Sequence, residues 1–357
     1  MTINQRKKTL ISLGKLLALF KKDKMDNSDL PKKYNPYIEA IRHIIKHSHE
    51  QNAWFTKENI LFALQSWADA LTPKKIDKWL DNYTFNEKTP KTVGVIMAGN
   101  IPLVGFHDFI SVLMSGNKIK AKLSSNDKQL LPILAKFMVD DNPKLKDFIE
   151  FTDEKLDNID AIIATGSNNS ARYFEYYFGK YPHIIRKNRN SVAVLTGNET
   201  EEELEKLTDD IMRYFGLGCR NVSKIFVPKN YDFNQLFKAL LKYKDLIKYQ
   251  KYANNYDYNK AIYLMSVDQQ VRNSLLDNGL VLLKEDIHYS SPIGTVFYEY
   301  YDDIEQVIKI IEKDKDKIQA VVSKADIPKA IPFGTTQQPE LWDYADGVDT
   351  MRFLLGL

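Results

Sequence analysis

The sequence contains only one cysteine, Cys219, among its 357 residues, so no disulfide can form within the chain. It also has no uninterrupted apolar run near the roughly 20 residues that a membrane-spanning helix needs. Its 50 basic and 47 acidic residues give a formal net charge of +3, so charge provides no reason to expect nucleic acid as a partner. These absences predict a protein of a reducing compartment that lacks a membrane span.

The first part of the chain, residues 1–90, is expected to be helical and to hold no catalytic residues. Apolar residues recur there at helical spacing, first at Leu10, Leu13, Leu16, Leu17 and Phe20. Lys15 interrupts the apolar stretch that a secretory leader would need, so we interpret the start as an amphipathic helix and expect a cytoplasmic protein. His43 and His47 would share a helix face, but a solvated polar face is favoured over a metal pair because no third ligand is specified.

From Lys91 onward, short apolar runs followed by glycine or polar turns alternate with helical stretches. TVGVIMAG, KIKAKL, AIIATGS and SVAVLTG begin the series, and AIYLMSV, GLVLL, TVFYEYY and IQAVVS are further candidate strands. After SVAVLTG, Thr200 and Glu203 form a capping box that predicts a helix ending at Phe215. This alternation predicts a doubly wound α/β protein.

The single cysteine lies on a predicted turn between that helix and the strand-like segment SKIFVP. Gly216 and Gly218 give the backbone freedom and leave room for a substrate, and Arg220 supplies a positive charge that would favour the thiolate. The alternative is a small buried hydrophobic residue, which is the usual fate of a lone cysteine. The local sequence favours a reactive thiolate at Cys219.

Asn100 is the candidate donor for a developing oxyanion. It follows a predicted strand in MAGNIPLVG, where Gly99 and Pro102 favour a non-helical turn, and a side-chain amide is a suitable hydrogen-bond donor to an oxyanion. An asparagine that stabilises its own turn is the alternative interpretation.

Two other strand ends carry residues suited to a nucleotide. Gly166 and Ser167 stand at a predicted helix N-terminus, which favours phosphate, although the GxGxxG pattern is absent. Lys122 and Ser124 end another strand and would suit a ribose or its phosphate. Ordinary helix capping and an ordinary polar strand end are the respective alternatives.

Taken in order, these segments over residues 91–340 resemble the aldehyde dehydrogenase superfamily, and within it the LuxC-type acyl-CoA reductases. MAGNIP is similar to the family's asparagine-proline turn, SGNKIKAKLSS to its ribose-binding stretch, ATGS to its cofactor-side turn, and GLGCRNVSKIFVP to its nucleophile segment. The resemblance implies Cys219 and Asn100 as catalytic residues, Lys122, Ser124, Gly166 and Ser167 as cofactor-binding residues, and no metal.

The resemblance also implies an aldehyde-dehydrogenase-like α/β fold with two doubly wound domains. Residues 1–90 would form a helical segment that packs on the cofactor domain, and residues 91–195 a nicotinamide-cofactor-binding domain. Residues 196–330 would form the catalytic domain, and residues 331–357 a C-terminal tail. A homo-oligomer is expected from the same resemblance.

Two departures from the superfamily's pattern are informative: the first favours reduction of an acyl-CoA, with a fatty acyl group expected, and the second concerns the cofactor. Where hydrolytic relatives carry a glutamate base, this chain has Arg186, so a thioacyl-enzyme would accept hydride or exchange with a thiol. Ser124 and Ser125 replace a carboxylate that would repel a 2′-phosphate, which favours NADPH, with NADH as the alternative. Ser291 stands where many relatives have another glutamate.

The remaining alternatives concern the direction of the reaction and the acyl donor. A CoA-independent aldehyde dehydrogenase would take its base from elsewhere, for example Glu285. A non-reducing acyl-carrying subunit would acylate Cys219 within a multi-enzyme complex, and the acyl group would come from a partner enzyme rather than CoA. His107 and His288 are the candidate general acids for aldehyde release.

Overall fold

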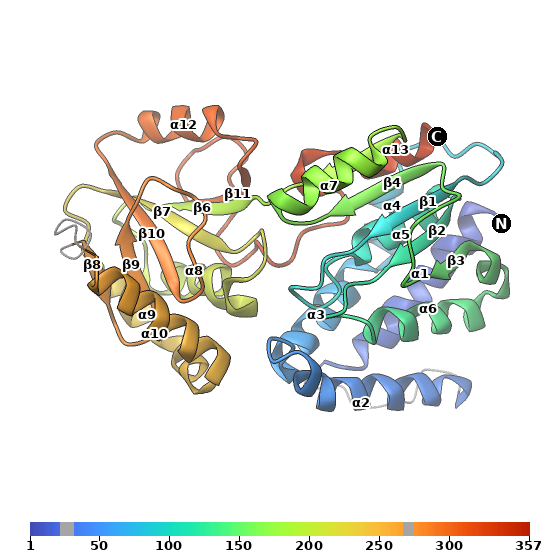
Figure 1. Ribbon diagram of the computed structural model, residues 1–357, viewed down its shortest axis with the longest axis horizontal. Helices are drawn as coiled ribbons and strands as arrows, with labels where there is room; N and C mark the ends of the chain where they lie inside the picture. Colours follow the sequence, from blue (N-terminus) through green and yellow to red (C-terminus); the bar gives the residue numbers. More distant parts are fainter. Residues whose placement is uncertain (22–31, 267–273) are drawn as a thin grey trace. The chain divides into compact units, whose positions relative to one another are not determined.

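The chain folds into two compact units, each described here by itself. The computed structural model describes residues 1–21, 32–266 and 274–357 (Figure 1). Unit 1 comprises Met1–Lys187 and Glu340–Leu357, and unit 2 comprises Asn188–Pro339. Both units are α/β structures with largely parallel sheets, as the sequence predicted.

Unit 1 contains a five-stranded sheet in the order β3-β2-β1-β4-β5, in which every pairing is parallel. Its strands are β1 (Thr92–Ile96), β2 (Lys118–Lys122), β3 (Ile149–Phe151), β4 (Ala161–Thr165) and β5 (His183–Arg186). Its helices are α1 (Ile3–Ala18), α2 (Asn35–Gln51), α3 (Lys57–Ala70), α4 (Pro73–Leu80), α5 (Phe106–Ser115), α6 (Leu130–Asp141), α7 (Asn168–Phe178) and α13 (Thr350–Leu355).

Both faces of this sheet are covered by apolar side chains, as a parallel sheet requires. In β4, Ala161 and Ile163 belong to the large core shared with α1, α5 and α6, whereas Ile162 and Ala164 pack with Phe178 of α7. Successive side chains of a strand point to opposite faces, so this alternation separates two layers of helices. The continuous apolar run of β4 therefore reflects burial on both sides.

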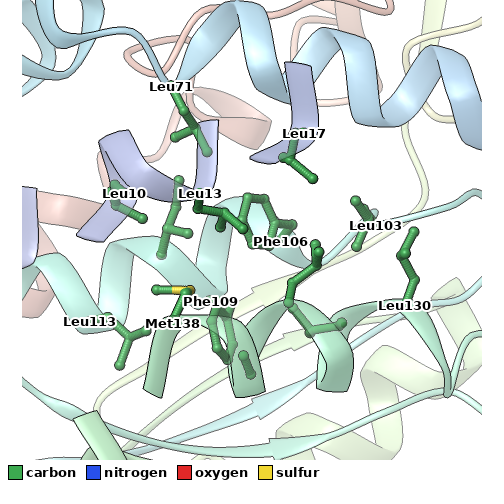
Figure 2. Close-up of a cluster of buried hydrophobic side chains, with 14 of the residues drawn as sticks. Leu10, Leu13, Leu17, Leu71, Leu103, Phe106, Phe109, Leu113, Leu130 and Met138 are labelled. Atoms are coloured by element: carbon green, nitrogen blue, oxygen red, sulfur yellow. The ribbon is translucent and has the colours of Figure 1, made fainter. Parts of the chain in front are cut away.

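The N-terminal helices pack on the sheet side that carries the larger core. Thr2 and Gln5 form a capping box that begins α1, and Leu10, Leu13, Leu16 and Leu17 are fully buried, as the helical spacing predicted. Figure 2 shows Leu10, Leu13 and Leu17 around Phe106 and Phe109 of α5. The expectation of a helical N-terminal segment is confirmed for the described residues, and residues 22–31 lie outside them.

The C-terminal residues belong to unit 1. Leu341, Met351 and Leu354 are buried in its core, and the indole nitrogen of Trp79 donates a hydrogen bond to the Tyr344 hydroxyl (2.7 Å). His107 on α5 contacts the carbonyl of Leu341 through its Nε2 (2.9 Å). The end of the chain therefore completes the same core that the first helices build.

Unit 2 contains a six-stranded sheet in the order β11-β6-β7-β10-β9-β8, in which only β8 runs antiparallel to its neighbour. Its strands are β6 (Asn190–Val194), β7 (Val222–Pro228), β8 (Leu275–Asp277), β9 (Leu282–Glu285), β10 (Thr295–Tyr301) and β11 (Ile318–Val322). Its helices are α8 (Glu201–Met212), α9 (Asn234–Leu240), α10 (Gln250–Leu264) and α12 (Ile304–Lys313).

Two sequence-based expectations for unit 2 are wrong. The segment AIYLMSV, expected as a strand, instead completes α10 as far as Leu264, because a short apolar run fits a helix as well as a strand; its Val267 lies outside the described residues. The helix expected to end at Phe215 ends at Met212, although its capping box at Thr200 is present. Tyr214 and Phe215 adopt left-handed backbone conformations that no α-helix contains.

Within the described ranges, no helix is long and apolar enough to cross a membrane.

The close approach of α1 to the end of α3 generates a prediction. A Cβ atom on Gly14 would lie 2.6 Å from the Leu71 carbonyl oxygen and 2.9 Å from the Leu71 Cβ. The variant Gly14→Ala therefore requires the backbone of α1 to move away from the end of α3. We expect this variant to lower the free energy of unfolding by about 1–3 kcal/mol, measured by denaturant titration. Lys15→Ala, on the exposed side of the same helix, is the control and should change it by less than about 0.5 kcal/mol. Equal stability of the two variants would contradict this packing.

Candidate active site

The predicted cofactor residues and Asn100 all follow the carboxyl ends of parallel strands in unit 1. The Asn100 turn follows β1, Lys122 and Ser124 end β2, and Gly166 and Ser167 follow β4. Because β1 pairs in parallel with both β2 and β4, these segments emerge at one edge of the sheet. The strand order also reverses between β1 and β4, which is where open α/β sheets bind ligands.

The Asn100 turn is pressed against the turn that follows β2. A Cβ atom on Gly99 would lie 2.5 Å from both Cβ and Oγ of Ser124, so only glycine permits this approach. The Leu103 backbone N–H donates to the Asp127 carboxylate (Oδ2, 3.1 Å) from a left-handed conformation with φ of 58°. The structure thus brings two of the predicted segments side by side.

The same turn is anchored in the hydrophobic core through Leu103, which is buried and lies close to Phe106 and Leu130 in Figure 2. Burial raises the pKa of Asp127 to about 6, although the Leu103 N–H that the carboxylate accepts acts in the opposite direction. An apolar anchor and a buried carboxylate therefore fix the backbone that presents Asn100.

Lys122 and Ser124 occupy the end of β2 and the turn beyond it. The Lys122 ammonium donates to the Glu154 carbonyl (3.0 Å), and the Ser124 hydroxyl accepts from the Asn126 backbone N–H (3.3 Å). Ser125 is exposed beside it. This strand end presents a cation and two hydroxyls, with no carboxylate at positions 124 and 125.

Gly166 and Ser167 form the junction between β4 and α7. Ser167 is the N-cap of α7, and its hydroxyl accepts from the Ser170 backbone N–H (3.1 Å). A Cβ on Gly166 would lie 2.8 Å from Ser170 Cβ and 2.9 Å from Phe174 Cε2, so glycine permits the tight strand-to-helix turn. The N-terminus of α7, where a helix dipole attracts anions, faces the same sheet edge as the Asn100 turn.

Cys219 lies in unit 2 on an exposed turn between α8 and β7, the position that the sequence predicted. The segment before it, Arg213–Gly216, leaves the helical path through left-handed Tyr214 and Phe215. A small pocket of about 20 Å³ is lined by residues that precede and follow the cysteine in the sequence, including Met212, Phe215 and Val222, together with Tyr252 and Ile293. The Cys219 thiol is exposed, so an electrophile can reach it from solvent.

Arg186, which the resemblance aligns with the glutamate of hydrolytic relatives, is buried at the end of β5. Its guanidinium forms a bidentate ion pair with Asp108 (2.5 and 2.9 Å) and donates to the Thr350 hydroxyl (3.0 Å). A guanidinium is always protonated in proteins, so Arg186 cannot accept a proton from water. Its role in unit 1 is to join α5, β5 and α13.

The other candidate acids and bases have simple surroundings. His107 contacts the Leu341 carbonyl and packs near Trp79 and Tyr344, which indicates a structural role. The exposed His288 ring lies 2.6 Å from the Asp286 carboxylate. Glu285 is exposed at the end of β9.

Two further candidate residues show no ligand-like arrangement. The Ser291 hydroxyl donates to the Thr295 carbonyl (2.7 Å) within its own turn. His43 and His47 stack with ring centroids 4.5 Å apart, and the parts of the chain that the structure describes contain no group of three or more side chains placed to hold a metal ion.

Two polar residues that the sequence analysis missed organise the region around Cys219. Asp210 in α8 accepts hydrogen bonds from the Gly334 N–H (2.6 Å), the Thr336 N–H (3.0 Å) and the Thr336 hydroxyl (2.8 Å). Burial raises its pKa to about 6, although these donors lower it. Asn221, two residues after the cysteine, caps the end of α8. Both residues stand beside other polar residues in the sequence, so no local pattern marked them.

Solved structures with the same architecture are aldehyde dehydrogenases. The enzyme KauB from Pseudomonas aeruginosa matches with a TM-score of 0.61 and 13% identity, over 92% of this chain and 73% of that one. An aldehyde dehydrogenase from Bacillus cereus, solved as an NAD+ complex, matches with a TM-score of 0.60 and 14% identity, over 91% and 73% of the respective chains. At this identity the likeness defines the class by fold: an aldehyde-dehydrogenase-like α/β protein.

The family follows from the sequence. The model of the acyl-CoA reductase (LuxC) family matches residues 12–329, so the chain belongs to this family and is an oxidoreductase of the acyl-CoA reductase type. No curated protein matches the sequence. The predicted family and fold class are both confirmed.

The buried carboxylate of Asp210 predicts a pH dependence of stability. Its pKa is raised from 3.8 to about 6 on folding, so the folded protein binds this proton more tightly than the unfolded chain does. The stability it contributes is complete at low pH and is lost as pH rises through about 4 to 6. Asp210→Asn cannot titrate, so the stability of wild type relative to this variant should fall by on the order of 2–3 kcal/mol across that window.

The measurement is denaturant unfolding of both proteins at a series of pH values. Comparing them at each pH removes the contributions of all other titrating groups. A difference that stays constant, or that grows as pH rises, would show that folding does not raise the pKa of Asp210.

Proposed function

We propose that this protein reduces the acyl group of an acyl-CoA, expected to be a fatty acyl group, to the aldehyde with NADPH through a thioacyl intermediate on Cys219. Membership in the acyl-CoA reductase family carries the proposal. The exposed thiol on a turn with two preceding glycines supports it, because a nucleophilic cysteine must be accessible to a thioester.

In the proposed reaction, the Cys219 thiolate attacks the thioester carbonyl, forms a new carbon–sulfur bond and expels the thiolate of CoA. The Asn100 amide and the Cys219 backbone N–H donate hydrogen bonds to the oxyanion. A nicotinamide held by the residues of unit 1 would supply the hydride that reduces the thioacyl carbon. The resulting thiohemiacetal breaks its carbon–sulfur bond, releases the aldehyde and returns Cys219 for the next cycle.

Unit 1 is the proposed cofactor-binding part, and unit 2 carries the nucleophile. The residues suit a dinucleotide: Gly166 and Ser167 open α7 after β4, and Lys122 and Ser124 lie at and just beyond the end of β2, on the other side of β1. A Cβ on Gly99 would collide with Ser124, so glycine lets the Asn100 turn and the turn after β2 lie together at the sheet edge. Ser124 and Ser125 present hydroxyls instead of a carboxylate, which favours NADPH over NADH because a 2′-phosphate meets no negative charge from them.

The surroundings of Arg186 support reduction over hydrolysis. A buried guanidinium held by Asp108 occupies the position of the missing base, so it cannot activate water against the thioacyl group. The acyl group would come from CoA or from a partner enzyme. We propose a homo-oligomer on the basis of the family resemblance, and a cytoplasmic location on the basis of the single cysteine and the amphipathic first helix.

Intact-mass measurement with and without NADPH tests the central step. The protein is incubated with a panel of acyl-CoAs, and wild type should gain the mass of one acyl group because Cys219 is its only thiol. Addition of NADPH should remove the adduct and release aldehyde. Cys219→Ala should gain no mass with any donor.

Each other outcome selects a different function. An adduct that persists with NADPH would identify an acyl-carrying subunit. Absence of an adduct with every acyl-CoA, combined with cofactor-dependent oxidation of an aldehyde, would identify an aldehyde dehydrogenase. An adduct on Cys219→Ala would remove this residue from the mechanism.

The proposed oxyanion donor is tested separately by Asn100→Ala. Loss of this donor should lower kcat by about 100-fold, equivalent to ~3 kcal/mol of transition-state stabilisation, in steady-state assays of aldehyde formation. Asn254→Ala, at an exposed position of α10, is the matched control and should behave as wild type. An unchanged turnover number in Asn100→Ala would exclude Asn100 from the site.

A further inference from the structure

The backbone that leads from α8 to Cys219 is strained. Tyr214, Phe215 and Gly216 adopt successive left-handed conformations with φ values of 54°, 59° and 75°. The first two have side chains whose Cβ atoms disfavour this conformation, so the run persists only where surrounding contacts enforce it. Burial of the Tyr214 and Phe215 side chains restrains these two residues. The peptide groups of the turn require restraints of their own.

The Asn221 side chain supplies those restraints. Its amide nitrogen donates to the carbonyls of Asp210 (3.0 Å), Ile211 (3.2 Å) and Arg213 (2.8 Å), which are left over at the end of α8. Its amide oxygen accepts the Gly218 backbone N–H (2.8 Å). One buried side chain therefore joins the helix end before the left-handed run to the residue immediately before the cysteine.

Both peptide groups that flank the Cys219 Cα are also held. The Asn221 backbone N–H donates to the Gly218 carbonyl (2.9 Å), and the Ser191 hydroxyl donates to the Cys219 carbonyl (3.1 Å). In a trans peptide the C=O and N–H point in opposite directions, so holding the Gly218 carbonyl toward Asn221 directs the Cys219 N–H away from it. The backbone N–H of Asn221 thus orients the proposed oxyanion donor, and the Asn221 side chain restrains the preceding peptide through the Gly218 N–H.

We propose that Asn221 is a positioning residue that holds the nucleophile turn in the conformation needed for acyl transfer. It contacts no reacting atom and acts through the backbone of Gly218 and Cys219. The inference rests on the proposed function, because it assigns Asn221 to the acyl-transfer step. Ser191 supports the same turn from β6 through a single hydrogen bond.

The test compares Asn221→Ala with Asn278→Ala. Asn278 is a matched control in the same unit: its side-chain oxygen accepts the Leu280 (3.0 Å) and Val281 (2.9 Å) backbone N–H groups beside left-handed Gly279. Both variants should lower the thermal unfolding midpoint. Only Asn221→Ala should speed amide hydrogen exchange across residues 213–220, by about tenfold or more, measured by mass spectrometry on the full chain.

The kinetic measurement is acyl transfer from an acyl-CoA to Cys219. Asn221→Ala should slow it by about tenfold or more, with KM for NADPH unchanged, because the variant disturbs the nucleophile turn and leaves unit 1 intact. Ser191→Ala, which removes one hydrogen bond and should fold normally, should slow transfer by a smaller factor. Asn278→Ala should transfer at the wild-type rate.

The two proposals fail in distinguishable ways. If wild-type Cys219 accepts no acyl group, the proposed function is wrong, and the rate of Cys219 alkylation by iodoacetamide replaces acyl transfer as the test of positioning. If acyl transfer occurs but Asn221→Ala and Ser191→Ala match Asn278→Ala in exchange and in rate, the positioning role of Asn221 is wrong. Should Asn221→Ala fail to fold, the Ser191→Ala comparison decides alone.

Discussion

The parallel pairing of β1 with β2 on one side and β4 on the other is the constraint on which the candidate site of unit 1 depends. Parallel strands end at the same edge of a sheet, so this pairing collects three turns that lie far apart in the sequence. Each turn then uses a small residue to approach its neighbour or its helix: Gly99 beside Ser124, and Gly166 beside Ser170. The surface proposed for a nucleotide is therefore backbone-rich, with N–H groups at the start of α7.

The hydrophobic core of unit 1 anchors the turns at the carboxyl ends of these strands. Leu103 connects the Asn100 turn to the cluster built by α1, α5 and α6, and the C-terminal segment packs into the same cluster through Leu341 and Leu354. The Arg186–Asp108 pair joins strand β5 to α5, and its link to Thr350 extends the connection to α13. The two buried charges of Arg186 and Asp108 are tolerated because they pair with each other and are hydrogen-bonded. The N-terminal helices and the C-terminal residues thus stabilise the turn that presents Asn100.

The nucleophile turn of unit 2 is built by a different principle. Hydrogen bonds from buried polar side chains, rather than apolar anchors alone, fix a backbone that departs from helical geometry. Asn221 satisfies carbonyls at the end of α8, and Asp210 holds residues 334–336 to the same helix. Such an arrangement leaves the thiol exposed while its backbone is held on both sides. This combination of access and fixed orientation suits the attack on a thioester that we propose for Cys219.

The sequence by itself determined the family, the α/β class, most strands and the exposed turn of Cys219. These features depend on local patterns: short apolar runs, a capping box at Thr200, and glycines at turns. The segment AIYLM was wrongly predicted as a strand because a short apolar run does not show a clear helical or strand period. The helix α8 was predicted to continue to Phe215 because tyrosine and phenylalanine occur in many helices, and their identity does not reveal a left-handed backbone. Only the tertiary structure revealed the ion pair of Arg186 with Asp108, 78 positions away, and the hydrogen bonds of Asp210 and Asn221. Such contacts depend on which residues folding brings together, and no local pattern encodes them.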